Sequence, residues 1–165
     1  MRFFLFILAM LFWAAPTFGA IDSGSVFGVW LTEEGNSKLE IYPCGDKACA
    51  KVVWLKYPTY LNSKEGPVGM DRVDVHNPDP TMQSRPILGL QVMEGLTLEG
   101  VWWQHGSCYD PQRGKHYQCR MHLESPTELK LRGFIGFSAI GRTYSLTRDP
   151  SVRTANSRDP KGNFH

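Results

Sequence analysis

The stretch KHYQCRMHL, residues 115–123, decides the fold class, because polar and apolar side chains alternate along it with a period of two. In an extended strand, successive side chains point to opposite faces of the sheet. One face would carry Tyr117, Cys119, Met121 and Leu123, and the other His116, Gln118, Arg120 and His122. This alternation predicts a β-strand with one buried face and one exposed face.

Similar short runs recur between residues 27 and 148, separated by turn sequences such as EEGN, CGDKAC, DPQRG and ESPTE. No stretch keeps helical periodicity for more than two turns. The other expected strands are Phe27–Thr32, Ser37–Cys44, Cys49–Lys56, Pro86–Met93, Val101–Tyr109, Glu128–Phe134 and Ile140–Arg148. Antiparallel strands joined by short turns favour an all-β fold, an eight-stranded closed barrel without exposed edges. A β-sandwich is the alternative.

A Gly-x-Trp pattern, Gly28 to Trp30, opens the first expected strand, and Arg148 ends the last. This combination resembles lipocalin-like barrels, in which an indole of the first strand packs beneath an arginine of the last. Such a contact joins aromatic burial to cation–π attraction. The resemblance gives Gly28, Trp30 and Arg148 a structural role, as a plug for one end of the barrel.

Residues 1–20 have the features of a secretory signal: Arg2, the apolar run FFLFILAMLFWAA, and then small residues suited to cleavage after Gly19. A retained N-terminal anchor is the alternative. No cysteine lies near this junction, which argues against a lipoprotein, and no later run is long enough to span a membrane. We therefore expect a periplasmic or secreted protein without a transmembrane segment in its mature chain.

About 145 residues follow the signal, enough for one domain. We expect a single barrel domain over residues 21–148 and a polar, flexible tail over residues 149–165. The 18 Lys and Arg nearly balance the 16 Asp and Glu, and no basic block is present. This composition gives no electrostatic footprint for nucleic acid.

Four cysteines follow the expected cleavage site, and an even number in an exported chain indicates disulfides. The four cysteines allow three different sets of disulfide pairs. Cys44 and Cys49 flank a four-residue turn, and Cys108 and Cys119 flank a second hairpin, so we expect the local pairs Cys44–Cys49 and Cys108–Cys119. The second pair depends more on hairpin register. Metal ligation is the competing interpretation, but there is no C-x-x-C and no clustered histidine, so we expect no metal.

Several stretches together resemble the bacterial exported family known as domain of unknown function 2147. They are GVWLTEEGNSKLEIYPCGDKACAKVVWLKYP, DVHNPDPTMQSRPILGL, CYDPQRGKHYQCRM and LKLRGFIGFSAIGRTYSLTR, and the similarity covers about residues 26–148. The resemblance implies a small barrel of lipocalin-like or fatty-acid-binding-like type in the cell envelope. It implies no established activity. Cys108 and Cys119 depart from the family pattern, so the second disulfide would be particular to this protein.

Residues 57–85 contain no clear strand, and an irregular segment of this length is usually functional or disordered. We expect this stretch, the lid segment, to cover one mouth of the barrel. Its polar cluster consists of Asp71, Asp74, Asn77, Asp79 and Arg85. These groups could offer oxygens to a hard cation or a carboxylate to a substrate. The favoured interpretation is structural, with Asn77 and Asp79 bonding their own backbone and an aspartate pairing with Arg85.

The leading functional hypothesis is binding of a small apolar or amphipathic ligand inside the barrel, without a cofactor. Candidate ligand-binding residues are Trp54, Trp102, His105, Tyr117, Arg132 and Arg142. The two arginines, if inward, would bind an anionic head group; otherwise they are exposed or tie a turn together. The first alternative is an envelope interaction or assembly module with a solid core and a protein partner. A hydrolase using Asp74 or Asp79 ranks last, since no nucleophile–base pattern is present and we assign no catalytic residue.

Overall fold

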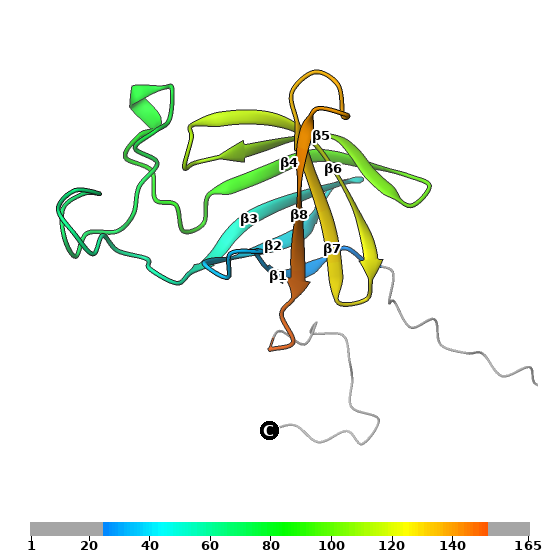
Figure 1. Cartoon of the computed structure of the whole chain (residues 1–165), viewed down its shortest axis with the longest axis horizontal. Helices are drawn as coiled ribbons and strands as arrows, with labels where there is room; N and C mark the ends of the chain where they lie inside the picture. The colour runs from blue at the N-terminus through cyan, green and yellow to red at the C-terminus, as the bar shows by residue number, and fades with distance from the viewer. Residues whose placement is uncertain (1–24, 152–165) are drawn as a thin grey trace, which may run out of the picture.

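The computed structural model describes residues 25–151, which form one closed antiparallel barrel of eight strands in sequential order. The strands are β1 Gly28–Leu31, β2 Ser37–Cys44, β3 Lys47–Leu55, β4 Gln91–Glu99, β5 Trp102–Asp110, β6 Lys115–Ser125, β7 Glu128–Phe134 and β8 Gly141–Arg148 (Figure 1). A single 3₁₀ turn, η1 Pro80–Met82, lies in the long β3–β4 connection. The predicted fold class is confirmed. Among the described residues, no helix is long and apolar enough to cross a bilayer.

Seven of the eight strands lie within two residues of the predicted bounds, and β4 is the exception. We expected a strand over Pro86–Met93, but β4 begins only at Gln91. The apolar run that suggested the earlier start pairs elsewhere: Pro86 bridges Val73, and Ile87 donates a backbone hydrogen bond of 2.9 Å to Arg72. A left-handed glycine, Gly89 with φ of 87°, then turns the chain into the barrel wall.

The barrel closes through pairing of β1 with β8, which sets Trp30 opposite Arg148. The guanidinium lies 4.1 Å from the centroid of the Trp30 ring, and the indole is fully buried. Arg148 also donates hydrogen bonds to the backbone oxygens of Ser25, Phe27 and Pro126, which ties three segments together at this end. Burial of so large an aromatic surface under a cation makes this end of the barrel a packed floor.

Strand order determines which connections share an end of the barrel. In a sequential antiparallel barrel the connections alternate between the two ends. The β1–β2, β3–β4, β5–β6 and β7–β8 connections therefore gather at one end, here called the mouth, opposite Trp30. The lid segment belongs to the β3–β4 connection and extends beyond the strand ends of the barrel (Figure 1).

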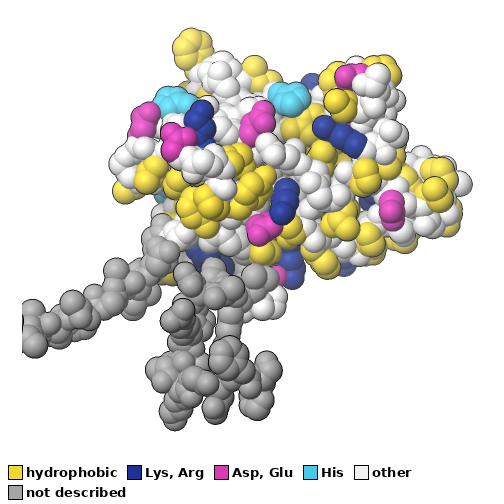
Figure 2. All heavy atoms as spheres, turned by 180° about the vertical axis from the view of Figure 1, so that it is seen from behind, with side chains coloured by type: hydrophobic (Ala, Val, Ile, Leu, Met, Phe, Trp, Pro, Cys, Tyr) yellow, Lys and Arg dark blue, Asp and Glu magenta, His cyan; other side chains and the backbone are white. Residues whose placement is uncertain are grey.

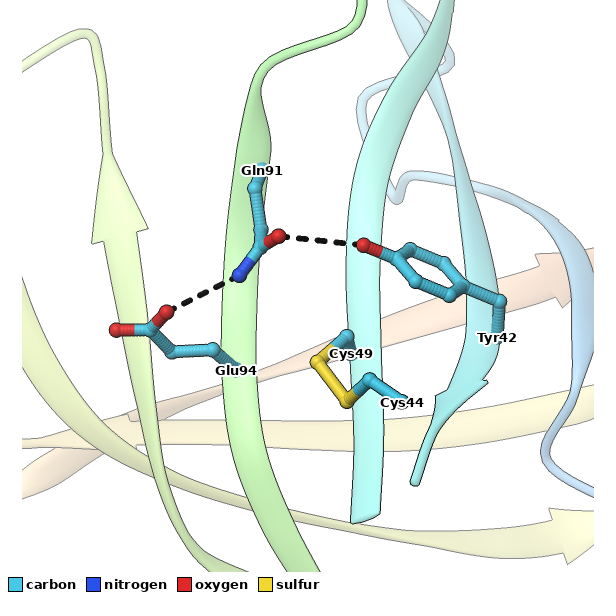
Figure 3. Close-up of a disulfide and its surroundings, with 5 residues drawn as sticks. All are labelled: Tyr42, Cys44, Cys49, Gln91 and Glu94. Atoms are coloured by element: carbon cyan, nitrogen blue, oxygen red, sulfur yellow. Dashed lines mark hydrogen bonds between the residues drawn. A yellow bond between two sulfur atoms is a disulfide. The ribbon is translucent and has the colours of Figure 1, made fainter. Parts of the chain in front are cut away.

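Both cysteine pairs are within bonding distance and form disulfides, with Cα–Cα distances of 5.9 Å in each. Cys44–Cys49 closes the β2–β3 hairpin beside a row of hydrogen bonds running from Tyr42 through Gln91 to Glu94 (Figure 3). Cys108–Cys119 joins β5 to β6 in the barrel interior, where Cys119 is buried.

Charged side chains of both signs are mixed over the back of the molecule (Figure 2), without a continuous basic face. The expected signal, residues 1–20, lies outside the described residues, as does most of the expected tail. The part of the tail that is described is held in place. Asp149 is buried, forms an ion pair with Lys38, and accepts two hydrogen bonds from Ser151.

Candidate functional site

A cavity of about 1090 Å³ opens at the mouth of the barrel. Its apolar lining includes residues of β2, β3, β4, β7 and β8, namely Leu39, Val52, Val92, Met93, Leu131 and Leu146. The cavity is open to solvent at the mouth, whereas its lining residues Met93 and Leu146 are only 2% and 1% exposed, so the barrel is packed between them and Trp30.

Tyrosines and arginines line the part of the cavity that lies nearest the mouth. Tyr117 and Tyr144 line it from β6 and β8, and the Arg142 guanidinium lies 4.8 Å from the centroid of the Tyr144 ring. Arg113, on the β5–β6 turn, donates a 2.7 Å hydrogen bond to Asp110. This bond raises the pKa of Arg113, and Tyr144 and Tyr117 act in the same direction. The lining carries four basic side chains in all, Lys64, Arg72, Arg113 and Arg142, and four acidic ones, Glu33, Glu34, Glu65 and Asp110. Arg72 and Arg113 form ion pairs with Glu65 and Asp110, which leaves Arg142 as the guanidinium beside the tyrosines that suits the anionic end of an amphipathic molecule.

The lid segment is fastened to the barrel by the Asp74 cluster, which consists of Asp74, Asn77, Arg85 and Tyr109. Asp74 is fully buried, and its carboxylate accepts a hydrogen bond of 2.7 Å from the Tyr109 hydroxyl. It also accepts 2.8 Å and 2.9 Å bonds from Asn77 Nδ2 and Arg85 Nε. A buried carboxylate requires such partners, because removing a charge from water without compensation is costly. Tyr109 belongs to β5, so these bonds join lid to wall.

Tyr109 has an unusual environment for a phenol. Burial raises its pKa, and the hydrogen bond to the Asp74 carboxylate raises the pKa further. The hydroxyl therefore stays protonated well into the alkaline range and keeps its role as a donor to Asp74. A 3.0 Å hydrogen bond from Asn77 Nδ2 to the same hydroxyl completes the arrangement.

A close backbone contact provides a second attachment of the lid. The His76 carbonyl packs against Gly114 so tightly that a Cβ on Gly114 would lie 1.8 Å from its oxygen. Gly114 also has φ of 62°, a conformation that favours glycine. Two stretches on which the family resemblance rested, D-x-x-N-P-D-P and Y-D-P-x-x-G-K, are therefore in direct contact.

Within the lid, Tyr60 forms a small core of its own. Its ring is buried, Gly66 packs against one face, and the Arg72 guanidinium lies 5.4 Å from the ring centroid. The Tyr60 hydroxyl accepts a hydrogen bond from the Val73 backbone, and Arg72 forms an ion pair with Glu65. The segment is irregular in backbone but has defined internal contacts.

The structure brings two of the six candidate ligand-binding residues to the cavity. Tyr117 and Arg142 line it, whereas Trp54, Trp102, His105 and Arg132 do not. Trp54 is 39% exposed beside Lys38. Trp102 and Arg132 have outward positions, and Arg132 donates to the carbonyls of Ser138 and Ala139 and to the Thr143 hydroxyl, tying the β7–β8 connection together. His105 sits in a bulge with φ of 64° and pairs with exposed Glu99.

The remaining polar residues of the lid act on the backbone. Asp79 caps η1 by accepting a bond of 2.9 Å from the Thr81 amide, and hydrogen bonds from Thr81 lower the Asp79 pKa. The Asn77 side-chain oxygen accepts a hydrogen bond from the Asp79 amide. Asp71 is exposed and bridges Thr59. Within residues 25–151, no group of three or more acidic, His or Cys side chains is arranged to hold a metal ion.

Sequence reasoning did not assign Tyr109, Tyr144 or Arg113 to the site. Tyr144 follows from register, because it lies opposite Leu131 on the inward face of β7 and β8. The sequence did not indicate a role for Arg113, because it lies in DPQRG, which has the composition of an ordinary turn. No local pattern could have shown that Tyr109 meets Asp74, which lies 35 residues away in the sequence.

Comparison with known proteins supplies a family and a fold. Residues 28–148 match the family described as an uncharacterized protein conserved in bacteria, DUF2147. Among solved structures, the chain is similar to protein HP1028 from Helicobacter pylori, described as belonging to the lipocalin family. The TM-score is 0.62 at 20% identity, over 76% of this chain and 83% of that one. A comparison with curated proteins gives no match.

Proposed function

The chain belongs to the DUF2147 family, and for this member we propose that the barrel binds a small amphipathic molecule at its mouth, outside the cytoplasm. The observation that carries the proposal is the cavity of about 1090 Å³ with an apolar floor. Small-molecule sites generally occupy about 300–1,000 Å³ and combine an apolar lining with a few polar groups. At about 1090 Å³ the cavity lies just above the upper end of that range, and its lining combines apolar with polar side chains.

The ligand's orientation follows from the distribution of charge. Its apolar portion lies against Leu131, Phe134 and Tyr144, which line the cavity and are only partly buried. Its anionic end meets Arg142 at the opening, because Arg113 is already paired with Asp110. Guanidinium groups bind carboxylate and phosphate with paired, charge-assisted hydrogen bonds. A fatty acid or a similar amphiphile fulfils both requirements.

The β7–β8 connection supports an apolar route into the cavity. Ile135, Phe137 and Ile140 are 65%, 81% and 73% exposed, and Ile135 and Ile140 also line the opening. Exposed apolar groups that adjoin one another commonly mark binding surfaces. Here they extend the apolar lining outward. The hydrocarbon portion of an entering ligand therefore contacts these side chains first, while the rest of the ligand is still in water.

Export is part of the proposal. It is supported by the signal-like sequence of residues 1–20 and by the two disulfides, which persist in oxidising compartments such as the periplasm. The hollow interior favours a carrier over an assembly module with a solid core. A hydrolase acting through Asp74 gains no support, since that carboxylate is fully buried and engaged by Tyr109, Asn77 and Arg85.

Binding of a fluorescent fatty acid, 11-(dansylamino)undecanoic acid, tests the proposal. Leu131→Trp places a large side chain in the cavity, whereas Val53→Trp places the same side chain on β3 at a position that does not line it. We expect the wild type and Val53→Trp to enhance the fluorescence and Leu131→Trp to lose at least about 10-fold in affinity, since overfilling removes the site. Equal binding by all three proteins would place the probe elsewhere.

Native mass spectrometry on protein isolated from the periplasm provides the complementary measurement. A discrete adduct, released on denaturation, is the expected result and would identify the ligand class. A bare mass, together with no binding of the fluorescent fatty acid, would contradict the carrier proposal and direct attention to protein partners.

A further inference from the structure

The outer wall of the barrel carries a second hollow, separate from the cavity. It has a volume of about 350 Å³ and lies over β5 to β8. Inward positions on these strands are Trp103, Met121, Leu131 and Tyr144, which are linked by cross-strand pairing. Their neighbours along each strand therefore point outward, and these neighbours line the hollow, here called the outer groove: Trp102, Arg120, His122, Lys130, Arg132 and Thr143.

Basic side chains face one another across the outer groove. Arg120 of β6 pairs in register with Arg132 of β7, and His122 pairs with Lys130. Like charges directly opposite each other on neighbouring strands destabilise a sheet. The groove lining contains no Asp or Glu, although Lys130 and His122 have partners at its edge in Glu128 and Glu124. Within the described residues, no carboxylate forms an ion pair with Arg120 or Arg132.

Donor groups in the outer groove have unused capacity. Arg120 Nε is a buried donor without a hydrogen-bond partner in the described part of the chain. His122 Nδ1 also lacks a partner, but it is a donor only in the charged imidazolium, because Nε2 faces the Glu124 carboxylate. Arg132 has five N–H donors. Three of its nitrogens bond Ser138, Ala139 and Thr143, so two N–H groups are left. Buried donors without acceptors are uncommon in native proteins. A ligand with several acceptor oxygens would satisfy them.

Trp102 supplies an apolar wall beside these donors. The Arg120 guanidinium lies 4.6 Å from the centroid of the Trp102 ring, and the His122 ring lies 4.0 Å away. Stacking on the indole fixes the plane of the Arg120 guanidinium and so reduces the entropy lost when it binds an anion. The groove's volume also exceeds what a bare inorganic anion needs, so there is room for an organic group against the indole.

We infer that the outer groove is a binding site for a small organic phosphate. The phosphate is held between Arg120 and Arg132, and its organic group lies against Trp102. A doubly charged anion offsets the repulsion between the two opposed arginines more fully than a carboxylate does, and its three free oxygens match the three or more unused donors. This site is independent of the cavity, because the two share no lining residue.

Isothermal titration calorimetry with phenyl phosphate, inorganic phosphate and benzoate at low salt tests the inference. We expect one saturable site that prefers phenyl phosphate to the other two anions. Arg120→Gln should weaken phenyl phosphate binding by about 10-fold to 100-fold, the usual effect of losing a charge-assisted hydrogen bond. Lys51→Gln is the matched control, because it removes one positive charge from a distant outward position on β3.

Several outcomes would overturn the inference. Equal weakening by Arg120→Gln and Lys51→Gln would reduce the effect to net charge, and equal affinity for benzoate would remove the preference for phosphate. The Arg120 side chain makes no hydrogen bond to any residue of the described range, so its replacement should preserve the fold, which thermal melting checks. As a measurement that needs no variant, the His122 ring resonances of the wild type should shift on titration with phenyl phosphate. Unchanged His122 signals at saturation would exclude the groove.

Discussion

Replacement of Arg85 by alanine is the sharpest test of how the lid is held. Arg85 forms an ion pair with Asp74 at 2.9 Å, and the side chains are 36% and 0% exposed. Removing one partner of a buried pair generally costs about 3–5 kcal/mol. Here Asp74 would lose its counter-charge but keep the hydrogen bonds from Tyr109 and Asn77. Because part of Arg85 reaches solvent, water can enter the vacated space and hydrate Asp74. We therefore expect the lower end of that range, about 3 kcal/mol.

This loss should fall on the lid and spare the barrel. Once the lid opens, Asp74 becomes hydrated, so the cost cannot exceed the free energy that keeps the lid closed. A loss of about 3 kcal/mol corresponds to opening that is on the order of 100-fold more frequent. When cleavage is slow compared with reclosing, proteolysis reports this equilibrium. Thermolysin should thus cut Arg85→Ala within residues 57–85 far faster than wild type, while the melting temperature of the barrel changes little.

Arg72→Ala is the matched control. Arg72 lies in the same lid segment and forms an ion pair with Glu65, but both side chains are partly exposed, 31% and 45%. Exposed pairs contribute about 0–1 kcal/mol, and an exposed cation–π contact such as that of Arg72 with Tyr60 adds about 0.5–1 kcal/mol, so cleavage should accelerate clearly less than in Arg85→Ala. If Arg85→Ala lowers global stability by its full 3 kcal/mol without selective cleavage of the lid, residues 57–85 are part of the barrel's scaffold and the reasoning fails.

Three further predictions concern the barrel and the Asp74 cluster. Tyr109→Phe should destabilise by about 1–3 kcal/mol in denaturant titration. Because the folded-state pKa of Tyr109 is raised, its contribution is present below about pH 10 and lost above it, so the variant should show a flatter alkaline limb. The pKa of Asp149 is lowered to about 2, chiefly by Lys38, so wild-type stability should fall between about pH 4 and 2, and Asp149→Asn should lack this slope. Trp30→Ala should cost about 3–5 kcal/mol, and a loss below about 1 kcal/mol would contradict the plug role.

Strand positions could be predicted from sequence because alternation and turn chemistry are local properties. Ser37–Cys44 and Glu128–Phe134 occupy the bounds that their patterns indicate. The misplacement of β4 has a non-local cause, since Pro86 and Ile87 pair with the lid and a turn at Gly89 precedes the strand. The apolar composition of this run does not indicate whether it pairs with the barrel wall or with the lid segment.

Ligand-binding residues were harder to predict, because strand register decides whether a side chain points into the barrel or out of it. Trp102 and Trp103 are neighbours, yet only Trp103 packs with the buried core, and a register irregularity follows between Trp103 and Gly106. A shift of one residue moves every side chain to the opposite face. Arg132 illustrates the same limit: its outward position follows from pairing with Arg120, which no single-strand pattern reveals.

The Asp74 cluster attaches the polar stretch of the lid segment to β5, and it also links the lid segment to the ligand site. Tyr109 and His76 line the cavity, and both join the lid to the β5–β6 hairpin, through the Asp74 carboxylate and the Gly114 backbone. On the proposed function, a ligand that contacts these residues in the closed form binds the open form less well. By linkage, occupancy must then stabilise lid closure by the same factor that closure strengthens binding. The buried carboxylate is therefore a structural group whose effect reaches the ligand through the position of the lid, without any contact between the two.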